Sequence, residues 1–140
     1  MRRSSPTLDL TMSPLSDEEK LFQAALDLDE AGRSAEAVKL LKSLVESREN
    51  PRHLLAYAQC LVRAGGDWKE AVACLQAALG KEPKYFEGGT RLFMADLLIR
   101  NGFKSEAIEQ WRIVAKMPPD GSGYGAVPDE AIVMLKRYEV

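Results

Sequence analysis

The sequence predicts an all-α protein, a right-handed solenoid of three stacked helical hairpins closed by a C-terminal capping helix. Two observations lead to this fold class. The motif G-x-x-x-E-A begins at Gly32, Gly66 and Gly102, at spacings of 34 and 36 residues. From the alanine of each motif, apolar residues recur at i, i+1, i+4, i+7 and i+8, which is the stripe of an amphipathic helix. A period of about 34 residues is typical of helical hairpins stacked in a row.

The composition fits one small globular domain and excludes several function classes. The chain has 140 residues, of which 46% are hydrophobic and 29% charged, close to the averages for globular proteins. The net charge of −2 gives no electrostatic reason to bind nucleic acid or an anionic membrane. Two cysteines are too few for a disulfide scaffold and favour a reducing compartment.

The N-terminal segment carries no recognisable targeting signal. Met1-Arg2-Arg3 is not followed by the apolar stretch of a signal peptide, and no apolar run approaches the roughly 20 residues of a membrane-spanning helix. Residues 1–15 contain two prolines and no apolar period, which predicts a disordered leader before a domain over 16–140. We expect a soluble, cytoplasmic protein with no membrane or nucleic-acid partner.

The first helix of each hairpin has its own start or stop signal. Ser16 with Glu19 three residues later forms a capping box, and Gly32 ends the helix that follows. Asn50 and Pro51 are an N-cap residue and a favourable first helical residue. The first helices are therefore expected at about residues 17–31, 51–64 and 85–101, each followed by a second helix after its motif glycine.

The C-terminal part supplies a cap for the open end of the array. Pro128 begins a predicted helix over about 128–139, in which four apolar residues share one face: Ala131, Met134, Leu135 and Tyr138. Such a helix covers the last apolar face of a repeat array. The Pro- and Gly-rich stretch 118–125 predicts a loop. Its glycines do not predict a phosphate site, because a helix rather than a strand precedes them.

The repeats resemble the tetratricopeptide repeat family over about residues 18–119. The resemblance rests on the period, the turn glycine, the Glu-Ala pair, and residues at matching offsets: Leu41, Leu75 and Trp111, then Leu44, Ala78 and Val114, then Pro83 and Pro119. It implies repeats at about 18–51, 52–85 and 88–121. The chain departs from the family pattern where an aromatic residue is usual, because Leu21, Leu55 and Arg91 stand there.

The inventory of catalytic groups is small. His53 is the single histidine, and a lone histidine on a helix of this kind is more often a packing residue than a ligand. Cys60 lies seven residues away, a backbone separation of about 10.5 Å on a helix, which suits one zinc ion poorly. Cys60 and Cys74 are interpreted as free buried thiols. We therefore expect no cofactor, no metal and no enzymatic activity.

The resemblance implies that the first helices line a concave groove, where helical-hairpin arrays bind. The groove would have an apolar centre and a rim of mixed charge, which is typical of a site for an apolar or amphipathic peptide. The residues predicted to form it are Phe22, Leu26, His53, Ala56, Cys60, Arg63, Leu92, Asp96, Ile99 and Arg100. The basic pattern by which some members of the family clamp a C-terminal carboxylate is missing.

These features predict a non-enzymatic adaptor or chaperone-like module whose partner is another protein or a peptide segment. Secretion and assembly chaperones built from three such repeats resemble the predicted architecture. One alternative is a homo-oligomeric structural module whose groove is filled by its own leader or by a neighbouring chain. The least favoured alternative is a small-molecule enzyme, which would need a cluster of titratable groups that the sequence does not offer.

Overall fold

The computed structural model describes residues 16–82, 86–118 and 127–139. Three features expected from the sequence lie outside these ranges: the leader over 1–15, the glycine-rich part of the loop before the last helix, and the repeat-ending prolines Pro83 and Pro119. None of the helices within the described ranges has the length and hydrophobicity needed to cross a bilayer.

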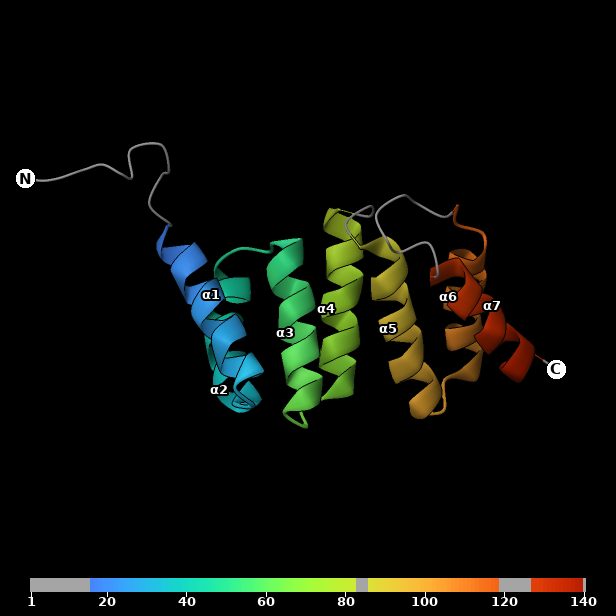
Figure 1. The fold of residues 1–140 in the computed structure, drawn as a ribbon, viewed down its shortest axis with the longest axis horizontal. Helices are drawn as coiled ribbons and strands as arrows, with labels where there is room; N and C mark the ends of the chain where they lie inside the picture. The colour runs from blue at the N-terminus through green and yellow to red at the C-terminus, as the bar shows by residue number, and fades with distance from the viewer. Residues whose placement is uncertain (1–15, 83–85, 119–126, 140) are drawn as a thin grey trace, which may run out of the picture.

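The described residues form seven helices and no strand. The helices are α1 (Asp17–Glu30), α2 (Ser34–Ser47), α3 (Pro51–Arg63), α4 (Trp68–Lys81), α5 (Glu87–Arg100), α6 (Lys104–Ala115) and α7 (Val127–Tyr138). Each helix packs against the next along the chain, and α1 and α7 lie at opposite ends of the array (Figure 1). The predicted fold class, three hairpins followed by a capping helix, is confirmed.

The predicted N-terminal caps of α1 and α3 are present. The hydroxyl of Ser16 accepts a hydrogen bond from the Glu19 amide at 3.1 Å, and the Asn50 side chain accepts from the Arg52 amide at 2.9 Å. The start of α5 was expected near residue 85, but the helix begins at Glu87. Phe86 precedes it in the left-handed conformation with φ 48°, and this conformation cannot continue a helix.

Glycines with positive φ end the first helix of every hairpin. Gly32 and Gly102, at φ 83° and 88°, have the conformation that a helix C′ position requires. In the middle hairpin this role falls to Gly65, at φ 79°, and not to the motif residue Gly66. Gly66 instead donates its amide to the carbonyl of Leu61 at 2.8 Å, because this turn is one residue longer than the other two.

Glycine-to-alanine substitutions should have opposite effects in the turn and in a helix. Gly102→Ala adds a Cβ at positive φ and should lower the free energy of unfolding by about 1 kcal/mol. Gly80 lies within α4 with open space where its Cβ would be, so Gly80→Ala should raise it by about 0.5 kcal/mol. Urea titrations of both variants check this. If both substitutions shift the free energy of unfolding in the same direction, the assignment of Gly102 to the turn after α5 is contradicted.

Residues at equivalent positions of the three repeats build the core. The motif alanines are fully buried, as are the large residues four positions later: Leu41, Leu75 and Trp111. Arg91 occupies the position where the family usually has an aromatic residue. Its guanidinium donates to Glu87 at 3.0 Å and to Gln110 of α6 at 2.8 Å. A polar bridge between α5 and α6 therefore replaces an apolar contact in the third hairpin.

The last helix covers the open face of the third hairpin, as predicted. Ala131 of α7 is fully buried, and the ring of Tyr138 stacks on Trp111 with centroids 5.4 Å apart and planes at 16°. Arg112 of α6 forms an ion pair with Glu139 just beyond the end of α7. The cap therefore joins α6 through both apolar and charged contacts.

Candidate functional site

Four of the ten predicted site residues lie in the interior. The exposed fractions are 5% for Phe22, 1% for His53, 7% for Ala56 and 1% for Cys60. Three of these residues belong to α3, which packs against α1 and α2 of the first hairpin and against α4, so this helix has little apolar side chain left at the surface. The structure therefore places these four residues beneath the surface, as packing residues between helices.

Three other predicted apolar residues are partly exposed. Leu26 of α1 and Leu92 and Ile99 of α5 pack against the core on one side and reach the surface on the other. Arg63 of α3 is exposed, and Asp96 of α5 is partly exposed. All five lie on the first helices of the three hairpins. We call the surface formed by these five residues the first-helix face.

The charges around the first-helix face are already paired with one another. Asp29 and Arg63 form an ion pair between α1 and α3 in which Arg63 Nε donates to Asp29 Oδ1 at 3.0 Å. This hydrogen bond lowers the pKa of Asp29, with help from the Ser34 hydroxyl, which donates to the same carboxylate at 2.7 Å. Arg100 pairs with Asp96 within α5 at 3.1 Å. The predicted rim is therefore close to electrically neutral.

An arginine that the sequence did not predict as a site residue covers the contact between α1 and α3. The Arg52 guanidinium lies 4.8 Å from the centre of the Phe22 ring and bonds to Glu19 at 3.2 Å. Beneath it, the His53 ring faces Phe22 at a centroid distance of 4.7 Å. The sequence does hold a signal for the other ion pair between these two helices. Asp29 and Arg63 are opposite charges at equivalent positions of adjacent repeats.

The two thiols are not placed for chemistry. Cys60 and Cys74 are both free, as the sequence suggested, but Cys60 is buried whereas Cys74 is only partly buried. Burial raises the pKa of each thiol to about 11. Both are therefore protonated at neutral pH, the unreactive form of cysteine. No group of His, Cys, Asp or Glu residues in the described ranges has the arrangement of a metal site.

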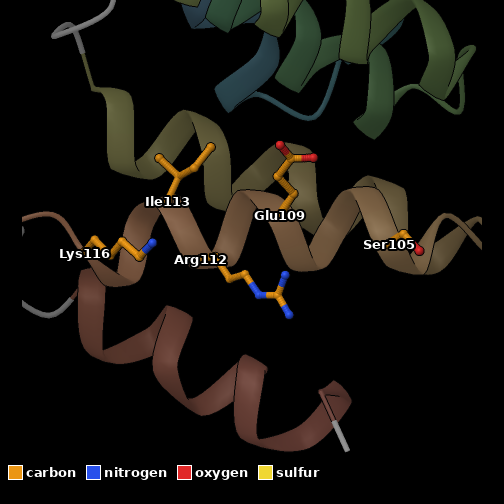
Figure 2. A pocket seen from close by; sticks show the side chains of 5 residues that line it. All are labelled: Ser105, Glu109, Arg112, Ile113 and Lys116. Atoms are coloured by element: carbon orange, nitrogen blue, oxygen red, sulfur yellow. The ribbon is translucent and has the colours of Figure 1, made fainter.

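A shallow hollow of about 530 Å³ lies on the outer side of α6. Figure 2 shows the side chains that line it, four from this helix and one from the residue that follows it: Ser105, Glu109, Arg112, Ile113 and then Lys116. Arg112 bonds to Glu139, and no second element within the part of the chain that the structure describes lines the hollow with polar groups that converge on it. Small-molecule sites need such convergence within an enclosing cavity. This hollow therefore does not compete with the first-helix face as a functional site.

Comparison with known families agrees with the repeat structure. Residues 28–87, from the last turn of α1 to the first residue of α5, match the family model of the tetratricopeptide repeat. The tetratricopeptide assignment predicted from the sequence is confirmed there. A search of curated proteins finds no match to the chain.

Solved structures extend the likeness beyond the matched repeats. The chaperone SycD of Yersinia enterocolitica, bound to a peptide of the translocator YopD, is 18% identical, with a TM-score of 0.77 over 89% of this chain and 95% of that chain. PcrH of Pseudomonas aeruginosa is 16% identical, with a TM-score of 0.76 over 95% and 100%. PcrH bound to the chaperone binding region of PopD is 16% identical, with a TM-score of 0.77 over 91% of this chain and 96% of that chain. At these identities the likeness shows that the chain shares their fold.

Proposed function

We propose that this chain is a non-enzymatic, chaperone-like module that holds an apolar or amphipathic segment of another protein on the first-helix face. The observation that carries the proposal is the partial exposure of three apolar residues on the first helices of two repeats, Leu26 of α1 and Leu92 and Ile99 of α5. The shared fold with SycD and PcrH supports it, since SycD was solved with a peptide of the translocator YopD and PcrH with the chaperone binding region of PopD.

The energetics of the face suit an apolar ligand. Burying the exposed parts of the three apolar side chains contributes about 25 cal/mol per Å². Asp29 and Asp96 already have arginine partners, so a ligand that covers them leaves no new charge unpaired, which is the costly outcome on binding. A strongly charged peptide would find no unpaired charge at these positions to attract it.

The enzymatic alternative has less support. The two thiols are protonated at neutral pH, and the His53 ring is buried without a hydrogen-bond partner in the described part of the chain. A nucleophile or general base needs a partner and access to substrate. These groups are better explained as packing residues of a binding scaffold.

Fluorescence anisotropy with labelled peptides tests the proposal. The probes are the YopD peptide bound by SycD and the chaperone binding regions of PopD and PopB, with both of which PcrH was solved in complex. Each has a scrambled control. At least one probe should bind saturably, at one peptide per chain and about tenfold or more tighter than its scrambled version, a difference of about 1.4 kcal/mol. Failure of all three probes to exceed their controls would contradict the proposal. Self-association that blocks binding would favour the homo-oligomeric alternative instead.

A further inference from the structure

The contact between α1 and α3 contains a buried histidine that the proposed function leaves unexplained. His53 is 1% exposed, and its ring lies against Phe22 of α1. Neither ring nitrogen has a hydrogen-bond partner among the described residues. A neutral imidazole carries one donor and one acceptor, and each costs about 1–3 kcal/mol when it is buried unpaired. Apolar packing would serve this contact better if stability were its only role.

The charged groups around His53 offer no free counterion. Glu18 and Glu19 approach it from α1, while Arg48 comes from the segment after α2 and Arg52 from α3 itself. Arg48 bonds to Glu18 at 2.7 Å, and Arg52 bonds to Glu19 at 3.2 Å. The two acids are therefore committed to the two arginines. A proton on the ring would place a third positive charge beside a balanced set.

We propose that His53 is an acid-sensitive joint, whose neutral ring keeps α1 packed on α3 and whose protonation loosens that contact. Because α1 carries Leu26, loosening it also disrupts the first-helix face, so acid should weaken ligand binding. The weakening of ligand binding rests on the proposed function, whereas the loosening of the contact between α1 and α3 does not. An imidazolium between Phe22 and the buried side of α3 must be hydrated, and water can reach it only when the two helices separate.

The direction of the pH effect follows from burial, which lowers the pKa of His53 below its ordinary value of 6.5. The unfolded chain therefore binds a proton more readily than the folded chain does. Stability is complete above about pH 6.5 and decreases as the pH falls toward the folded pKa. His53 is the single histidine of the chain, so side-chain proton uptake in this range has one clear source.

The joint is tested by thermal unfolding at pH 7.5, 6.5 and 5.5, together with NMR titration of the single histidine Cε1 proton. Wild type should lose about 3 °C or more of Tm between pH 7.5 and 5.5, with a histidine pKa below 6.5. His53→Leu removes both unpaired nitrogens, so it should be at least as stable as wild type at pH 7.5 and should keep its Tm at pH 5.5. His53→Met provides the same test with a more adaptable side chain.

Two results would overturn the joint: a wild-type Tm that does not change with pH, or the same acid loss in both variants. Hydrogen exchange locates the effect, since residues 17–30 should lose protection at pH 5.5 before residues 104–115 do. Loss of protection that begins in α6 would contradict the placement of the joint between α1 and α3.

Binding is then compared at the two pH values with the PopD chaperone binding region as probe. Wild type should bind about threefold or more weaker at pH 5.5, while His53→Leu should change less, since titration of the peptide affects both proteins equally. If this probe does not bind at pH 7.5, the comparison is made with the YopD or PopB peptide instead. Failure of all three would refute the proposed function and leave the unfolding result as the test of the joint. If peptide affinity depends on pH equally in wild type and His53→Leu, protonation of His53 does not control binding.

Discussion

Leu92→Glu is expected to weaken binding of the PopD chaperone binding region by about 100-fold or more while the helical spectrum stays unchanged. Leu92 is partly exposed on α5, so a glutamate there can remain hydrated in the free protein. When the ligand arrives, the carboxylate must lose its water without gaining a partner, which costs several kcal/mol. A 100-fold loss of affinity corresponds to about 2.8 kcal/mol. Anisotropy titration and circular dichroism measure the two quantities.

Two matched variants separate the ligand effect from general damage. Ile113→Glu makes a similar change at another partly exposed residue, on the outer side of α6, and should leave affinity unchanged. Arg100→Ala removes a charge that is 67% exposed and paired with Asp96, so affinity should change by about twofold and depend on salt. Unfolding of Leu92→Glu would place this leucine in the core, and a dominant Arg100 effect would indicate a charged ligand.

Trp111→Ala is expected to be the most damaging single truncation for the fold, lowering the free energy of unfolding by about 3–5 kcal/mol. Trp111 is 1% exposed and contacts both the third hairpin and the Tyr138 ring of α7. Its loss leaves a large cavity and removes the aromatic contact that holds the cap. Urea titration followed by far-UV circular dichroism gives the value.

The other tryptophan supplies the control. Trp68 begins α4 and is only partly buried, with its ring tilted against the exposed Phe103 at 5.4 Å. Trp68→Ala should therefore cost about 1.5 kcal/mol or less. Equal losses for the two variants would contradict the central position assigned to Trp111 and the role of α7 as a cap.

The sequence predicted the repeat architecture because the same pattern of core residues recurs in each of the three repeats. One buried alanine per motif, one large residue four positions later and one turn signal define a hairpin, and three copies leave little ambiguity about the period. The cap followed from the same logic, since Ala131 and Tyr138 occupy one helical face and the last hairpin needs a cover.

The details that were not predicted depend on how closely neighbouring helices approach. Helical spacing placed His53 and Cys60 on one side of α3, but it could not show that both side chains are buried. Nor could the motif show that the middle turn has one more residue, which moves the positive φ to Gly65. Charges at equivalent positions of adjacent repeats, such as Asp29 and Arg63, were an available signal, because those positions lie side by side on neighbouring first helices.

The most direct test of the central claim is hydrogen exchange of the full chain with and without the PopD chaperone binding region. If a peptide segment is held on the first-helix face, protection should increase in α1 and α5, around Leu26, Leu92 and Ile99, with little change in α2 and α6. Protection confined to α6 or α7, around the hollow lined by Ile113 or along the cap, would contradict the account.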